Sequence, residues 1–259
     1  MDLRPLGSTG IPVSPLGLGT VKFGRNQQVK YPRAFDLPSD ATIADLLLMA
    51  RELGINLLDT APAYGGSEQR LGRLLPGPRD EWVIVTKVGE TFEHGQSRFD
   101  FSAKATRASV ERSLRRLHTD YLDVVLIHSD GEDERILDHE PVLETLNDLK
   151  AEGLIRAHGF SSKTVAGGLR AAELCDVLMV TYNPVDTGER PVLDAAGLRH
   201  KGVLVKKGLR SGHVAGADGV LESLRFVFAH PAVSSLVVGT INPDHLRANV
   251  AALHRVIEG

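Results

Sequence analysis

Short apolar runs alternate with segments of helical periodicity along most of the chain, and this alternation constrains the fold more than any other sequence feature. Each run has the length of a β-strand, and each is followed by apolar residues at helical spacing. Repeated strand–helix units predict a parallel sheet covered by helices. The expected strands lie at residues 16–18, 55–58, 82–86, 124–127, 157–160, 177–180, 203–205 and 235–238.

The number of these units favours one α/β architecture over its main competitor. Eight units in 259 residues fit a closed (β/α)8 TIM barrel, which takes about 250 residues, better than a six-stranded doubly wound sheet. Residues 124–127 are apolar on both faces, as a buried parallel strand requires. Ahead of the barrel, residues 3–6 and 11–13 flank a glycine-rich turn and predict an N-terminal β-hairpin that covers the bottom of the barrel. We expect one domain spanning residues 1–259.

The expected helices begin and end at residues that favour helix caps. Ser39 is a good N-cap for the first clear helix, and Gly54 stands where its C-terminal cap belongs. Pro141 suits the first turn of a helix near 140–152. The remaining helices are expected at residues 67–75, 103–117, 164–173, 190–200 and 219–229, with a last one beginning at Asn242-Pro243.

Composition excludes several classes of function. The net charge is −3, so the chain lacks the excess of positive charge that is typical of proteins that bind nucleic acid or an anionic membrane. The sequence has no run of 18 consecutive apolar residues, the length needed to span a bilayer, and we expect no apolar leader segment at its N-terminus. Cys175 is the single cysteine, so no intrachain disulfide can form and a reducing compartment is favoured. We therefore expect a cytoplasmic protein.

Polar residues follow the expected strands at the barrel rim where TIM-barrel active sites form. Asp59, Lys87 and His128 come directly after the second, third and fourth strands, and Tyr64 lies in the loop after Asp59. Taken singly, Asp59 could be a turn or helix cap, Tyr64 a structural loop residue, and His128 an ordinary histidine at the edge of the core. Lysine is rarely buried without a partner. Their coincidence on consecutive strand ends favours a catalytic role.

These four side chains suit the protonation of a developing alkoxide. A free tyrosine has a pKa near 10, which is high for an acid at neutral pH. A nearby lysine would lower the pKa of the phenol, an aspartate would hold that lysine, and a histidine would orient the substrate carbonyl. The set therefore predicts reduction of an aldehyde or ketone. The histidines have no metal-site spacing, and no metal is expected.

Several motifs carry a resemblance to the aldo-keto reductase family along nearly the whole chain. They are Leu16-Gly17-Leu18-Gly19-Thr20, Asp59-Thr60-Ala61-x-x-Tyr64-Gly65-x-Ser67-Glu68, Thr86-Lys87-Val88-Gly89, Asp120-Tyr121-Leu122-Asp123 through His128, Gly159-Phe160-Ser161-Ser162 and the final Gly239…Pro243…Leu246…Asn249. The resemblance implies a (β/α)8 barrel, NADPH-dependent reduction of carbonyls without a metal, and a catalytic tetrad of Asp59, Tyr64, Lys87 and His128.

The same resemblance places a nicotinamide cofactor across the barrel mouth rather than on a Rossmann glycine motif, which the sequence lacks. The implied contacts are Gly19, Thr20, Asp59, Ser161, Ser162, Met179, Lys206, Leu209, Gly239, Thr240, Asn242, His245 and Asn249. Three positions depart from the family pattern: Ser162 replaces a common asparagine, Met179 a glutamine, and Lys206 an aromatic residue. Lys206 could lay its stem on the nicotinamide, pair with pyrophosphate, or form a solvated pair with Lys207.

The segment expected to hold the adenosine 2′-phosphate has little fixed positive charge. Thr240, Asn242, His245 and Asn249 could donate hydrogen bonds there, helped by the start of the last helix. We expect NADPH to be preferred weakly, with NADH usable. The substrate pocket is expected to be open, with Lys22, Phe23 and Phe92 near its rim, and to accept small or varied carbonyl compounds.

Two other functions fit the same residues. One is a cofactor-binding sensor or regulatory subunit, against which the complete tetrad argues. The other is an alcohol or sugar dehydrogenase, since the same groups act in the oxidative direction. We expect a monomer or a weak homo-oligomer that binds a small carbonyl substrate and neither nucleic acid nor membrane.

Overall fold

Eight parallel strands form a closed barrel in the computed structural model, which describes residues 1–29, 31–32, 34–214 and 216–257. Within these residues the last strand pairs with the first, placing Leu236 opposite Leu16. The strands are β3 (Leu16–Gly19), β4 (Leu57–Asp59), β5 (Val83–Val88), β8 (Leu122–His128), β9 (Ile155–Ser161), β10 (Val177–Thr181), β11 (Gly202–Lys206) and β12 (Ser235–Val238). The predicted (β/α)8 barrel is confirmed.

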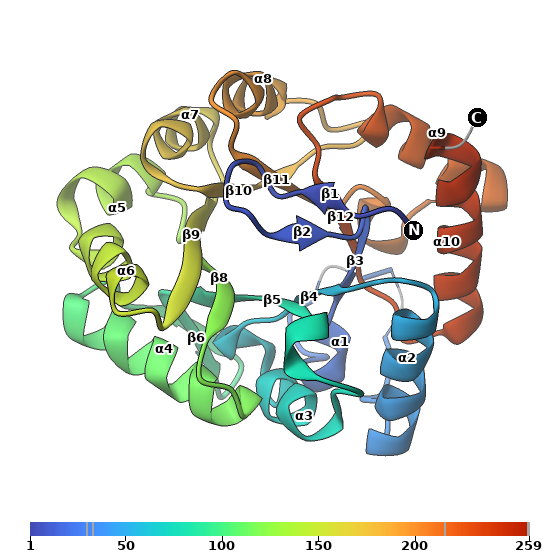
Figure 1. Cartoon of the computed structure of the whole chain (residues 1–259), viewed down its shortest axis with the longest axis horizontal. Coiled ribbons are helices and arrows are strands. Elements are labelled where there is room, and N and C mark those ends of the chain that lie inside the picture. Colours follow the sequence, from blue (N-terminus) through green and yellow to red (C-terminus); the bar gives the residue numbers. More distant parts are fainter. Residues whose placement is uncertain (30, 33, 215, 258–259) are drawn as a thin grey trace.

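Helices surround the barrel, as Figure 1 shows. Their bounds are α1 (Val21–Gly24), α2 (Asp40–Glu52), α3 (Ser67–Leu74), α4 (Ala103–Leu117), α5 (Asp133–His139), α6 (Val142–Ala151), α7 (Val165–Leu174), α8 (Arg190–Leu198), α9 (Gly216–Phe228) and α10 (Pro243–Ile257). Ser39 caps α2 as predicted, because its hydroxyl accepts a hydrogen bond from the Thr42 amide at 3.1 Å. The helix expected near 140–152 is α6, which begins after Pro141, and the short helix α5 that precedes it was not predicted.

Two apolar layers hold the barrel together. One lies between the strands and the helices, and the other fills the barrel interior. The hairpin of β1 (Arg4–Pro5) and β2 (Pro12–Val13) lies over one end of the barrel (Figure 1), and Leu6, Ile11 and Val13 pack with the interior residues. This end is the bottom, because the Ser8 amide donates to the His200 carbonyl, just before β11 begins. The predicted hairpin and its position are confirmed.

One hairpin at the opposite end was not predicted. β6 (Glu90–Glu93) and β7 (Gln96–Phe99) pair with each other soon after β5, and β6 contacts the 3₁₀ turn η1 (Pro62–Tyr64). The residues of β7 are all exposed, so the sequence lacks the apolar alternation from which strands are recognised. This hairpin matters because it follows Lys87 directly and lies beside Tyr64.

Candidate active site

Asp59 and Lys87 form a buried ion pair at the C-terminal ends of two adjacent strands. The Lys87 ammonium lies 2.6 Å from Asp59 Oδ1 and donates a second hydrogen bond to the Thr60 carbonyl at 2.8 Å. The Lys87 side chain is only 2% exposed. A dehydrated ammonium requires such partners, because burying an unpaired charge is strongly unfavourable. β4 and β5 thus place a fixed positive charge at the predicted rim.

Tyr64 lies next to this pair on the turn η1. The Lys87 ammonium is 4.7 Å from the centre of the Tyr64 ring. The pKa of Tyr64 is nevertheless raised well above 10, chiefly because the phenol is buried and further because Asp59 and Glu90 lie near. The net shift is therefore opposite to the lowering expected from Lys87, because burial makes the largest contribution. Tyr64 keeps its proton at neutral pH.

His128 completes the predicted set at the end of β8. Its Nδ1 atom lies 2.7 Å from Oε2 of Glu90, the first residue of β6. Burial lowers the pKa of His128, and the Glu90 carboxylate opposes that shift. Asp59, Tyr64, Lys87 and His128 all line one cavity. The sequence reasoning did not single out Glu90, and the signal available was an acidic residue three positions after Lys87.

The backbone of the loop that carries Tyr64 packs directly against the backbone of Gly24. A Cβ added to Gly24 would lie 2.3 Å from the Tyr64 carbonyl oxygen and 2.4 Å from the Ser67 amide. Gly65 has a φ of +61°, and a Cβ there would lie 2.2 Å from the Gly24 carbonyl oxygen. Neither glycine has room for a side chain. Their close approach fixes where the Tyr64 hydroxyl sits.

Replacing Gly24 with alanine should therefore displace Tyr64. We expect kcat to fall by about tenfold to a hundredfold, because small displacements of a reacting group are costly. The free energy of unfolding should fall by about 1–3 kcal/mol from overpacking. Steady-state rates and urea unfolding measure both. Gly66→Ala is the matched control, because a Cβ there meets no atom within 4 Å; equal behaviour of the two variants would contradict the assignment.

Thr20 supports Asp59 from behind instead of lining the cavity. Its hydroxyl donates to the Asp59 carbonyl at 2.9 Å and accepts from the Ser67 hydroxyl at 2.7 Å. Asn242 is also absent from the cavity lining; its Oδ1 accepts from the Asp244 amide at 2.9 Å at the start of α10. Both were predicted as cofactor contacts, and the structure assigns their side chains to local hydrogen bonds.

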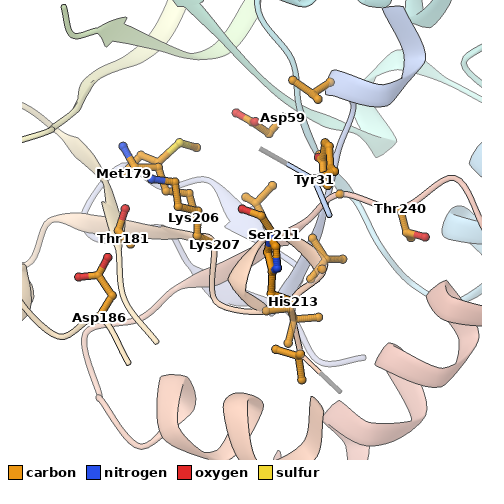
Figure 2. A pocket seen from close by; sticks show the side chains of 18 of the residues that line it. Tyr31, Asp59, Met179, Thr181, Asp186, Lys206, Lys207, Ser211, His213 and Thr240 are labelled. Carbon is orange, nitrogen blue, oxygen red and sulfur yellow. The ribbon is translucent and has the colours of Figure 1, made fainter. Parts of the chain in front are cut away.

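The cavity holding the four catalytic candidates has a volume of about 1360 Å³. A single small-molecule site typically occupies about 300–1,000 Å³, so this cavity can take a large ligand beside a small one. Figure 2 shows side chains of β10 and β11 on one wall and Tyr31 on the other. The other predicted cofactor contacts line it: Gly19, Asp59, Ser161, Ser162, Met179, Lys206, Leu209, Gly239, Thr240, His245 and Asn249.

Lys206 points into this cavity from the end of β11. Its ammonium donates to the Ser161 hydroxyl at 2.9 Å and to the Ser162 carbonyl at 2.8 Å. Burial lowers the pKa of Lys206 to about 8, and Glu189 partly opposes the shift. The alternative of a solvated pair with Lys207 is wrong, because only Lys207 is exposed.

Glu189 is a second residue that the sequence reasoning missed. It precedes α8, and its Oε1 accepts from the Ser162 hydroxyl at 2.6 Å while its Oε2 accepts from the Thr181 amide at 2.6 Å. The hydroxyl proton of Ser162 is thus already engaged, and the oxygen of that hydroxyl can still accept a hydrogen bond. No motif in the sequence indicated this contact.

The expected pocket rim is partly wrong. Lys22 does line the cavity, and its ammonium lies 4.0 Å from the centre of the Tyr31 ring and 5.0 Å from that of Phe35. Phe23, by contrast, is fully buried in the core. Phe92 lies outside the cavity lining, with the Arg25 guanidinium 3.4 Å from its ring centre. The hydrophobicity of the two phenylalanines did not indicate whether each lies in the core or at the pocket rim.

Two further features concern metal binding and membrane insertion. Across residues 1–29, 31–32, 34–214 and 216–257, no three His, Cys, Asp or Glu side chains gather as a metal site would require. In the same part of the chain no helix combines the length and apolar character needed to cross a bilayer.

Comparison with known proteins identifies the family. Residues 15–206 match the profile described as "Aldo/keto reductase family". A solved structure from Pseudomonas aeruginosa, described as an aldo-keto reductase, is 56% identical, with a TM-score of 0.91 over 98% of this chain and 96% of that one.

Two curated relatives match in part. The NADH-specific methylglyoxal reductase of Escherichia coli is 34% identical over 72% of this chain and 60% of its own length. D-arabinose 1-dehydrogenase of Saccharomyces cerevisiae is 39% identical over 63% of this chain and 47% of its own length, so the match spans about half of that relative. With the barrel, the four converging side chains and the profile match in hand, the chain belongs to the aldo/keto reductase family of oxidoreductases, whose members use nicotinamide cofactors.

Proposed function

We propose that the protein is an NADPH-preferring reductase of small or varied aldehydes and ketones, with Tyr64 as the proton donor. The observation that carries the proposal is the convergence of Asp59, Tyr64, Lys87 and His128 on one cavity. We infer further that it acts in the cytoplasm as a monomer or weak homo-oligomer.

Each residue has a distinct task in this reaction. Tyr64 holds the proton that passes to the substrate oxygen, and its raised pKa keeps it protonated until negative charge develops on that oxygen. Lys87, fixed by Asp59 at 2.6 Å, supplies a positive charge that stabilises the phenolate left behind. His128 lines the cavity and orients the carbonyl. A bound reduced nicotinamide supplies the hydride to the carbonyl carbon.

The cavity suits such a cofactor in its chemistry as well as its size. A Cβ on Gly239 would lie 2.5 Å from the Tyr31 hydroxyl oxygen and 3.9 Å from the Gly19 carbonyl oxygen, so bare backbone forms this wall. Ser161, Ser162 and Lys206 offer polar atoms for the nicotinamide amide and phosphates. Near α10, Thr240, His245 and Asn249 line the cavity without an arginine or lysine among them.

This lining favours a weak NADPH preference with real use of NADH. A 2′-phosphate would meet hydroxyl, amide and imidazole groups rather than the fixed positive charge that usually selects for it. The E. coli relative is NADH-specific by name. Initial rates followed at 340 nm with a panel of aldehydes and ketones should show turnover with both cofactors, and a higher kcat/KM with NADPH. Strict dependence on NADH would contradict the preference, whereas tight cofactor binding without turnover would favour a regulatory subunit.

The oxidative direction is the second candidate, because the yeast relative is named a dehydrogenase of D-arabinose. The same residues serve it, with the phenolate form of Tyr64 accepting the alcohol proton. Sugar oxidation can be assayed with oxidised cofactor at alkaline pH and compared with carbonyl reduction. The direction whose substrate has the lower KM is the physiological one.

A further inference from the structure

Glu90 contacts the active site without reaching the cavity. Its Oε2 lies 2.7 Å from His128 Nδ1, its side chain is 10% exposed, and it is absent from the cavity lining. His128 does line the cavity, on the far side of this contact. Glu90 therefore contacts the cavity lining through His128, while its charge also raises the pKa of Tyr64.

The Glu90 carboxylate is held in place from two sides. The Ser97 hydroxyl donates to its Oε1 from the neighbouring strand β7. The Arg25 guanidinium lies 3.9 Å from the same oxygen and also donates to the Ala63 carbonyl at 3.2 Å. Burial alone would raise the pKa of Glu90, but His128, Ser97 and Arg25 lower it to about 2. The carboxylate is ionised at every pH at which the enzyme would work.

A fixed carboxylate selects one tautomer of a neighbouring imidazole. An ionised carboxylate can only accept hydrogen bonds, so the ring nitrogen facing it is favoured when it carries the proton. His128 Nδ1 is buried and makes no aligned hydrogen bond within the described residues, and Glu90 Oε2 lies 2.7 Å from it, close enough to accept a hydrogen bond from a proton-bearing Nδ1. The Nε2 atom is then left with a lone pair on the cavity side.

We propose that Glu90 is a positioning residue that fixes the Nδ1–H tautomer of His128 and stabilises its protonated form. This inference rests on the proposed reductase function and deepens it. Neutral His128 presents an acceptor, which pairs with the hydroxyl of an alcohol. Protonated His128 presents an Nε2–H donor, which pairs with a carbonyl oxygen. Glu90 thus sets the pH at which the site changes from holding alcohol to holding carbonyl.

The other charges around His128 act against its protonation. Burial lowers the pKa of His128 most, the Lys87 and Lys206 ammonium groups lower it further, and the Glu90 carboxylate opposes them. On the Glu90 side the remaining cation is Arg25, while Tyr64 on η1 stays neutral. Removing the Glu90 charge should therefore move the titration of His128 to lower pH.

The test is Glu90→Gln in the full-length protein, which keeps the side-chain size and removes the charge. The pH profile of kcat/KM for carbonyl reduction should show its histidine-dependent step shifted down by about one pH unit. At a pH above both midpoints, kcat/KM should fall by about tenfold, mainly through KM, and halfway between them by about threefold. Glu90→Asp, which keeps the charge, should recover most of the shift. Glu93→Gln, at the exposed end of the same strand, is the matched control and should behave as wild type.

A second measurement does not depend on turnover. Nitrogen-15 spectra of the histidine rings, with His128 identified by its loss in His128→Asn, should show the Nδ1–H tautomer in the wild-type protein and a loss of that preference in Glu90→Gln. An Nε2–H tautomer in the wild type, or identical His128 titration in both proteins, would overturn the proposal. If the spectra behave as expected but no carbonyl is reduced, the assignment of Glu90 stands and the proposed function fails.

Discussion

Tyr64→Phe is expected to lower kcat for carbonyl reduction by about 10²–10⁴-fold, the usual contribution of a positioned general acid. The substitution removes one oxygen atom and leaves the ring in its place on η1, 4.7 Å from the Lys87 ammonium. Among the described residues, Tyr31 is the other tyrosine that lines the cavity, and burial raises its pKa well above the usual value, so it is a poorer acid than a free phenol. The proton would have to come from water.

Cofactor affinity is the control for this variant. A fluorescence titration with NADPH should give a Kd close to that of the wild-type protein, because the phenol hydroxyl contributes to the chemical step more than to cofactor binding. Tyr31→Phe should retain most of the rate. If Tyr64→Phe instead kept most of its activity, the proton donor would have to be sought elsewhere in the cavity.

Lys87→Met should have the largest effect on stability. Removing one partner of a buried ion pair leaves the other charge uncompensated, which costs about 3–5 kcal/mol. Here the Asp59 carboxylate, about 5% exposed, would lose the ammonium that lies 2.6 Å away. Chemical denaturation should report this loss in the free energy of unfolding, and turnover should fall to background as well.

The double variant Asp59→Asn/Lys87→Met separates charge burial from simple damage to packing. With both charges removed, the amide that replaces the Asp59 carboxylate needs only hydrogen bonds, so much of the lost stability should return. Activity should stay absent, since the charge next to Tyr64 is gone. If the double variant were no more stable than Lys87→Met, the instability would come from lost packing of the lysine stem.

The barrel could be predicted because its signal is local. Each strand is a short apolar run and each helix is an amphipathic segment. Ser39 therefore predicts the start of α2, and residues 124–127 predict β8, without reference to the rest of the chain. The positions of Asp59, Lys87 and His128 follow from the same logic, because parallel strands deliver the residue after each run to one rim.

What could not be predicted depends on contacts between distant segments. Glu90 reaches His128 only because β6 turns back beside η1, and an exposed hairpin leaves no periodic pattern. The raised pKa of Tyr64 comes from burial and from the nearby Asp59 and Glu90 carboxylates, which only the three-dimensional structure reveals. Phe23 and Phe92 look alike in sequence, yet one lies in the core and the other beneath Arg25.

The hairpin that covers the bottom of the barrel has a consequence for synthesis of the chain. The hairpin precedes every barrel strand along the chain, yet one of its contacts is very distant in sequence: the Arg4 side chain donates to the Val233 carbonyl, 229 positions later. Closure of β12 on β3 joins similarly distant segments. Contacts of such long range slow folding, so the barrel can close only after nearly all of the polypeptide has left the ribosome. We expect the nascent chain to expose both the β1–β2 hairpin and the apolar barrel interior that this hairpin covers for most of translation.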